Sequence, residues 1–335
     1  TDMSTGTTTL LAGGNDDAAS SVVNIGFDFL FMGVNYTQFS ASSNGYMRLG
    51  ATAVTTTAAS QTGTATGAII TAFGGDQATV TAAGANSKVH YKLFGTAPNR
   101  VLVVEWANMK MNYSSYATAT AGNGTYQVLI YETTGIVDLK YGAMSVAATF
   151  LTGPVIGFSA GTTAGAIGSI TSSTNAVTTN GTAWINNTYT AGAITNLNSA
   201  ADGSRRVYSF VPASPAAPSS LSFTSVGATS LTLNWTDNAS NELGYMIYRS
   251  TDGVTYTLNA QVAANATTAA QTGLTPSTLY YYKVTAFTEG ATSTVSGSQS
   301  TTACAPLATG TYSVGPTGTY LNITAALSAL TNGTS

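Results

Sequence analysis

Apolar side chains recur at every second position in several short runs of this chain. One run places four of them in order: Ile25, Phe27, Phe29 and Phe31. Residues 230–235 repeat the pattern with leucine and tryptophan. A period of two puts alternate side chains on opposite faces of a β-strand. Thr, Val and Tyr, which favour strands, are abundant, and 35 glycines are available for turns. The sequence therefore predicts an all-β, multidomain protein.

Proline-rich stretches divide the chain. The clearest seam is residues 212–218, which hold three prolines in seven positions and cannot join a sheet on either side. A weaker seam lies near Cys304 and Pro306. We therefore expect a β-sandwich over 1–211, a linker over 212–218, a second domain over 219–303, and the start of a further domain over 304–335.

Strand signals dominate the first segment. Residues 101–106 form an almost continuous apolar run, as expected of a central strand, and residues 126–132 and 135–141 are predicted to form a hairpin. Residues 43–45, Ser-Asn-Gly, predict a turn before another short strand. Many short strands without a helical period favour a jelly-roll-like sandwich.

Three stretches of this segment resemble the nidogen-like sandwich domains of secreted bacterial proteins. They are IGFDFLFMGVNYTQFSASSNGYMRLG (25–50), IITAFGGD (69–76) and YQVLIYETTGIVDLKYGAM (126–144). Their order and rough spacing agree with that family across most of residues 20–160. The resemblance implies a role in matrix or surface assembly and no catalytic residue.

The second domain carries three strand signals, at 230–235, 243–249 and 279–287. Residues 274–280, LTPSTLY, are similar to the tyrosine corner of a fibronectin type III domain, in which a tyrosine hydroxyl binds a loop backbone. WTDNASNELGYMIYRSTDGVTYTLNA (235–260) is similar to bacterial members of that family. The resemblance covers about 216–302 and implies an Ig-like spacer or adhesion module.

The last residues predict a short strand and turn at 310–315, followed by a helix. Four apolar residues at i, i+3, i+4 and i+7 define one face of about two helical turns: Ile323, Ala326, Leu327 and Leu330. Asn332-Gly333 is expected to end the helix. This segment resembles the opening of parallel β-helix regions in secreted Bacteroidetes surface proteins. We therefore expect the chain to be a piece of a longer protein.

Side chains that perform catalysis are scarce. The chain has one histidine, one cysteine and 7% charged residues. General acid–base, nucleophilic and metal chemistry need such groups held close together. The sequence predicts no enzyme, and no catalytic, cofactor-binding or metal-binding residue. The thinly spread net charge of −3 argues against a nucleic-acid partner, and no apolar run is long enough for a membrane span.

His90 lies between Lys88 and Lys92 on a predicted strand. Because Val89, Tyr91 and Leu93 share the opposite face, His90 is expected to point outward with the two lysines into solvent. Neighbouring positive charges disfavour metal binding or protonation there. We therefore do not assign His90 a catalytic role.

Oxygen ligands occur together at Asp237, Asn238 and Glu242. Their spacing differs from that of a calcium loop, and Asp and Asn favour turns after a strand. Turn formation is the preferred interpretation. The groups Asp16-Asp17 and Asp76 are weaker candidates for calcium.

Two further features have a structural and a functional interpretation. Residues 108–124 hold Met109, Met111, Tyr113 and Tyr116, which could stack on sugars from a loop. The period of two of Met109, Met111 and Tyr113 instead favours the inner face of a strand continuing from Trp106 for these three residues. Cys304 is expected to behave as a small buried apolar residue, with an intermolecular disulfide as the alternative.

The leading hypothesis is a non-enzymatic subunit of an extracellular bacterial surface fibre, filament or hook-like appendage used for attachment. Its expected partners are copies of itself, since weakly charged surfaces and exposed strand edges favour self-association. Cell-surface or matrix glycans are the second class of partner, for the alternative of a lectin-like adhesin. A third hypothesis is the accessory region of a larger secreted hydrolase.

Overall fold

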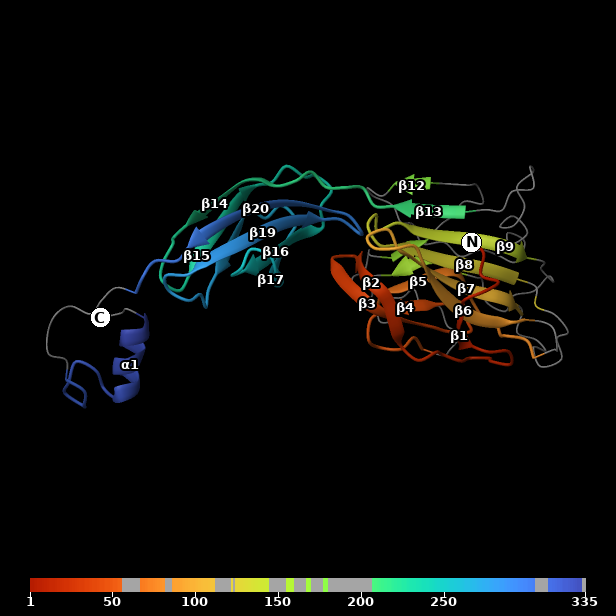
Figure 1. Cartoon of the computed structure of the whole chain (residues 1–335), viewed down its shortest axis with the longest axis horizontal. Coiled ribbons are helices and arrows are strands. Elements are labelled where there is room, and N and C mark those ends of the chain that lie inside the picture. Colours follow the sequence, from red (N-terminus) through yellow and green to blue (C-terminus); the bar gives the residue numbers. More distant parts are fainter. Residues whose placement is uncertain are drawn as a thin grey trace. The chain divides into compact units, whose positions relative to one another are not determined.

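The computed structural model describes residues 1–55, 67–81, 86–111, 122, 124–144, 155–159, 167–169, 177–179, 207–304 and 313–332. The chain forms two compact units (Figure 1). Unit 1 comprises Thr1–Ala213 with Glu289–Ala291, and unit 2 comprises Ser214–Thr288 with Thr292–Ser335. Both units consist of β-sheets, which confirms the all-β, sandwich-like fold class.

Unit 1 contains two sheets. The larger has seven strands in the order β1 (Thr8–Leu11), β6 (Lys88–Phe94), β7 (Val101–Met109), β8 (Gly124–Tyr131), β9 (Val137–Met144), β13 (Val207–Val211) and β12 (Val177–Thr179). The other has six, in the order β11 (Ile167–Ser169), β10 (Val155–Ser159), β5 (Ile69–Gly74), β4 (Met47–Leu49), β3 (Val34–Ala41) and β2 (Val23–Phe31). Neighbouring strands are antiparallel except β12 and β13, which are parallel.

The predicted strands of unit 1 are confirmed. β7 lies inside the seven-stranded sheet, and β8 and β9 form the hairpin expected from residues 126–141. The alternate residues of β2 are buried as the period of two requires: Ile25, Phe27, Phe29 and Phe31. They join one apolar core with side chains from both sheets. Trp106 stacks on Tyr126 in this core, with ring centroids 5.3 Å apart.

The predicted turn at residues 43–45 is packed tightly against the neighbouring segment. Gly45 has a φ of +85°, and a Cβ atom there would lie 2.0 Å from the carbonyl oxygen of Phe73. Only glycine fits both the conformation and the space. The Trp106 indole donates a hydrogen bond to the carbonyl of Ser42 at 2.8 Å. The Ser-Asn-Gly turn is therefore a packing element of the sandwich.

Unit 2 contains a three-stranded and a four-stranded sheet. The first has the order β14 (Ser219–Thr224), β15 (Leu231–Thr236) and β18 (Thr268–Gln271). The second has the order β17 (Thr257–Ala263), β16 (Gly244–Ser250), β19 (Leu279–Phe287) and β20 (Thr292–Ser300). Side chains from both sheets form a separate core. The tyrosine corner is confirmed, since the Tyr280 hydroxyl accepts a hydrogen bond from the Thr275 backbone N–H at 2.9 Å.

The described part of the C-terminal segment holds a parallel bridge between Val314 and Tyr320 and the helix α1 (Ile323–Asn332). This confirms the helix expected from the apolar spacing, and it is the one helix of the described residues. Across the described residues, helices fall short of the length and apolar character needed to cross a membrane.

Candidate functional site

Four polar side chains form a row across the outer face of the seven-stranded sheet. Strand register places His90 on β6 opposite Glu105 on β7, Glu105 opposite Gln127 on β8, and Gln127 opposite Lys140 on β9. Directly opposed residues in antiparallel strands have side chains close enough to interact. We call these four residues the polar row.

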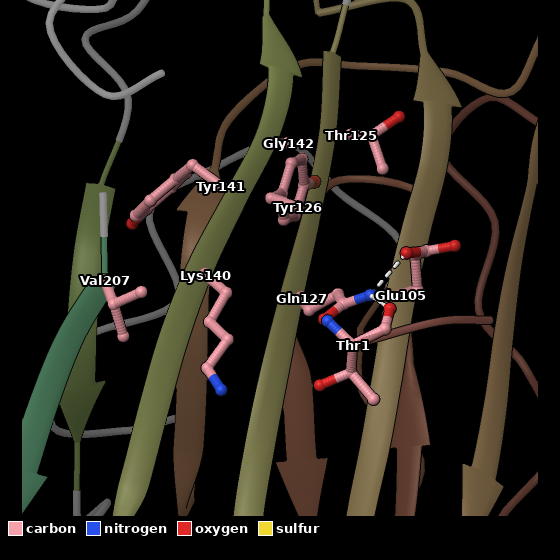
Figure 2. Close-up of a pocket in the computed structure, with 9 residues that line it drawn as sticks. All are labelled: Thr1, Glu105, Thr125, Tyr126, Gln127, Lys140, Tyr141, Gly142 and Val207. Carbon is pink, nitrogen blue, oxygen red and sulfur yellow. Dashed lines mark hydrogen bonds between the residues drawn. The ribbon is translucent and has the colours of Figure 1, made fainter. Parts of the chain in front are cut away.

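Hydrogen bonds connect the polar row to the N-terminal segment of the described chain. His90 Nε2 lies 2.8 Å from Glu105 Oε1, and Gln127 Nε2 donates to Glu105 Oε2 at 2.6 Å. The same Gln127 amide donates to the Thr1 carbonyl at 2.7 Å and accepts from the Thr1 amino group at 3.1 Å (Figure 2). The row thus fixes residue 1 over the sheet.

Residues 1–7 hold this position through apolar contact as well. Met3 is 5% exposed and forms a small cluster with Val103 and Leu129, which point out from the sheet. Lys92 Nζ donates to the Thr5 carbonyl at 2.9 Å. We call residues 1–7 the N-terminal strap, because they cover part of the outer sheet face.

His90 is buried, so the expectation that it points into solvent is wrong. Its exposed fraction is 1%. Val89 does face the core, as predicted. On the outward face, however, the Glu105 side chain bonds to His90 Nε2, and Thr9 of β1 pairs opposite His90. His90 Nδ1 has no hydrogen-bond partner in the described part of the chain.

A cavity of about 210 Å³ lies beside the polar row (Figure 2). Glu105, Gln127 and Lys140 line it, together with Thr125 and Val207 among others. Lys140 Nζ lies 3.4 Å from Asp138 Oδ2. His90 is not among the lining residues, and the Glu105 carboxylate accepts bonds from His90 and Gln127. His90, Glu105 and Gln127 are therefore hydrogen-bonded to one another, and Gln127 is also bonded to the strap. In this arrangement these side chains stabilise the fold.

Three aspartates of unit 1 converge on one place. One oxygen from each of Asp16, Asp17 and Asp76 lies within 4.8 Å of those of the other two. Asn44, from the Ser-Asn-Gly turn, donates to Asp17 at 2.7 Å and accepts from the Gln77 backbone N–H at 3.0 Å. Carboxylate oxygens are the ligands that Ca²⁺ prefers, but such clusters are common without an ion. The expectation of no metal site stays a prediction.

Burial and repulsion change the acidity of this cluster. Partial burial raises the pKa of Asp16, and the Asp17 charge raises it further. Burial also raises the pKa of Asp76, with added repulsion from Asp16 and Asp17. Asp16-Asp17 and Asp76 were the weaker calcium candidates in the sequence, and the fold brings them together although Asp76 is distant along the chain. Only Asp76 lies in a family-like stretch (69–76), so the sequence held no signal that pairs it with Asp16 and Asp17.

In unit 2, the candidate oxygen ligands Asp237, Asn238 and Glu242 each form a hydrogen bond to a different segment of the chain. Asp237 accepts a hydrogen bond from the Tyr245 hydroxyl, and burial together with this bond raises the pKa of Tyr245. Glu242 is buried and accepts from the Asn265 backbone N–H at 2.9 Å. Asn238 donates to the carbonyl of Ala217 at 2.9 Å. These contacts fix turns, as the preferred interpretation states.

The two remaining candidates have different outcomes. Met109 and Met111 are fully buried in the core, as the structural interpretation expects. The strand does not continue regularly to them, because the register of β7 shifts between Trp106 and Met109 and β7 ends at Met109. Tyr113 and Tyr116 lie outside the described residues. Cys304 is partly exposed rather than fully buried.

Comparisons with known proteins agree with the two-domain resemblance. The fibronectin type III domain family matches residues 216–302. An FN3 domain of human collagen XX is 27% identical, covers 25% of this chain and 91% of its own, and has a TM-score of 0.22. The domain of human fibronectin type III domain containing protein 3 is 22% identical, covers 29% and 95%, and has a TM-score of 0.25.

No curated protein matches the chain. The family described as NIDO related matches residues 1–212, the whole of the described seven-stranded and six-stranded sheets. This match covers more than half of the sequence and agrees with the nidogen-like resemblance. The chain therefore belongs to the NIDO-related family and carries a fibronectin type III domain after its NIDO-related domain.

Proposed function

We propose that this chain is a non-enzymatic structural subunit of an extracellular fibre, filament or hook-like appendage used for attachment, and that it assembles with copies of itself. One observation carries the proposal: ionisable groups on the outer face of the large sheet are bonded within the fold. His90 pairs with Glu105, and Asp138 accepts hydrogen bonds from Tyr131 and Ser209. Groups fixed in this way stabilise a scaffold.

A second ion pair supports the same use of charge. Arg100 forms a bidentate pair with Glu132, and its Nη1 donates to the carbonyl of Gly26 at 2.5 Å. Gly26 belongs to β2 of the six-stranded sheet, whereas Arg100 directly precedes β7 of the seven-stranded sheet. The Arg100 side chain therefore links the two sheets of unit 1 at one point.

The two modules suit a subunit that bears load. Each unit has its own apolar core. Long antiparallel ladders, such as the nine residue pairs between β19 and β20, must break many hydrogen bonds together when sheared. NIDO-related and fibronectin type III modules are of the extracellular type, and we place the subunit at the cell surface on that basis. In this proposal residues 304–335 open a further, β-helix-like domain.

The experiment is electron microscopy of the purified chain at increasing concentration, with sedimentation velocity on the same samples. We expect oligomers or filaments whose fraction grows with concentration. Isolated monomers throughout the concentration range contradict the proposal. A glycan array on the same material tests the lectin alternative, because a purely structural subunit binds no glycan specifically.

A further inference from the structure

β20 forms one edge of the four-stranded sheet of unit 2. It follows β19 in the strand order, and among the described strands none is hydrogen-bonded to its second edge. β14 of the three-stranded sheet contacts β20 without pairing with it. Its nine residues pair with β19 without a register shift, from Thr292 opposite Phe287 to Ser300 opposite Leu279. β20 is therefore a long and regular edge, without the bulge that commonly twists such an edge away from a partner.

Hydrogen bonding at the end of β20 shows which backbone groups face outward. The Thr301 N–H donates to the Thr278 carbonyl at 3.0 Å, so the backbone N–H of Thr301 is directed toward the β19 side. Because strand residues alternate in direction, Thr294, Ser296 and Ser298 direct their N–H and C=O groups to the outer edge. All three residues are exposed. This edge presents a row of donors and acceptors to a partner strand.

The edge also lacks charge. Residues 292–300, TSTVSGSQS, contain no charged residue and no proline. Lys283 lies opposite Ser296, but its ammonium is 3.9 Å from the centroid of the Tyr256 ring. Tyr256 directly precedes β17, the strand at the opposite edge of the sheet. The nearest lysine is therefore directed away from β20.

The edge strand of the six-stranded sheet shows the protection that β20 lacks. On β2, the carbonyl of Gly26 accepts a hydrogen bond from the fixed guanidinium of Arg100. Charged side chains at an edge prevent pairing with another chain. On β20, the inner face is closed by its own unit, since a Cβ at Gly297 would lie 3.2 Å from Leu221 and 3.4 Å from Phe223. The unpaired edge and the neutral outer face of β20 therefore remain exposed.

We propose that β20 pairs in antiparallel fashion with β20 of a second copy, so that two four-stranded sheets become one. The inference rests on the proposed self-assembly and identifies β20 as one of the surfaces through which copies associate. With Ser296 at the two-fold axis, Ser296 faces its own copy and Thr294 faces Ser298. No like charges meet in this register, which is the condition for favourable cross-strand pairs. The contact is isologous and joins copies in pairs, so a fibre needs a second contact elsewhere.

The first test uses Ser298→Pro in the full chain. Proline at an outward-facing edge position leaves the ladder to β19 intact and removes a donor from the outer edge. We expect the dissociation constant of the dimer to rise by about tenfold or more in sedimentation equilibrium. Gln261→Glu on β17 is the control at the opposite edge, and its dissociation constant should equal that of the wild type.

A second test, which does not depend on the proline variant folding, introduces opposite charges at Ser296 in two variants. Ser296→Glu places a carboxylate on an exposed position of its own sheet, but faces a second glutamate across the two-fold axis. We expect Ser296→Glu and Ser296→Lys each to associate weakly, and their mixture to associate at least as tightly as the wild type. Hydrogen exchange should show new protection of the Thr294, Ser296 and Ser298 amides in the dimer.

The outcomes separate this inference from the proposed function. If the wild type assembles while the Ser296 variants behave like the wild type, or the β20 amides stay unprotected, another surface carries assembly. That result overturns the β20 contact and leaves the proposed function standing. A wild type that stays monomeric overturns both.

Discussion

The three aspartates Asp16, Asp17 and Asp76 show how position sets the energetic effect of a residue. A carboxyl group whose pKa is raised in the folded state holds its proton more tightly there than in the unfolded chain. Its contribution to the free energy of unfolding is therefore most favourable below the ordinary pKa of 3.8. This stabilisation is lost as pH rises through the higher pKa of the folded state. The cluster reduces the stability of unit 1 at neutral pH.

Asp76→Asn should consequently stabilise unit 1 at neutral pH. The amide keeps the shape of the side chain and removes its repulsion with Asp16 and Asp17. We expect a higher urea midpoint at pH 7 than in the wild type, and a smaller decline in the midpoint from about pH 4 to about pH 7. Asp28→Asn, on the exposed face of β2, serves as the control, because Asp28 interacts with the positive charge of Arg100 and its neutralisation should not raise the midpoint. A midpoint for Asp76→Asn below that of the wild type at pH 7 would contradict a destabilising Asp76 charge.

His90 marks the limit of sequence reasoning at this scale. The period of two correctly predicted that Val89 faces the core. It gave no information on what covers the outward side chains, since that depends on Glu105 from the next strand and on the strap. The Asp16–Asp76 proximity was missed for a related reason. Both contacts depend on which strands and loops become neighbours, and the alternation along one strand does not contain that information.

Among the elements, the N-terminal strap is the one that local sequence patterns did not predict. It has no strand over residues 1–7 and lies on the sheet through Met3, Thr5 and Thr1. The regular elements were predicted well, including β2, the β8–β9 hairpin, the tyrosine corner and α1. These have repeating apolar patterns or turn signals, whereas the strap has a single buried methionine.

Met3→Ala tests the strap directly. Truncating a buried methionine removes its contacts with Val103 and Leu129, at a cost of about 2 kcal/mol in the free energy of unfolding. Because the strap can separate without global unfolding, we expect faster limited proteolysis within residues 4–7 as the first sign. Ser4→Ala, at an exposed position of the same segment, is the matched control. Equal cleavage rates for Met3→Ala and Ser4→Ala would show that Met3 does not anchor the strap.

For the whole molecule, the scarcity of charge determines how assembly should respond to salt. The chain has a net charge of −3 and 7% charged residues, and the proposed β20 contact is neutral. Salt screens interactions between charges and leaves backbone hydrogen bonding between neutral edges largely unaffected.

Association of the wild type should therefore depend weakly on salt. We expect the dissociation constant to change by less than about threefold between about 0.05 and about 0.5 M NaCl. The mixture of Ser296→Glu with Ser296→Lys provides the contrast, since its association should weaken as salt rises. A steep loss of wild-type assembly in the same titration, measured by sedimentation, would indicate a charged interface instead.

The ion pairs and hydrogen bonds of the basic side chains have a consequence for resistance to proteolysis. Among the described residues, Lys92 is bound to the strap, Arg100 to Glu132, Lys140 to Asp138, and Lys283 lies over Tyr256. Proteases that cut after lysine or arginine need an accessible, locally unfolded chain around that residue. These four basic residues lie in strands or next to one, where local opening breaks a ladder. The contacts of these four side chains thus protect the adjacent peptide bonds from trypsin-like enzymes.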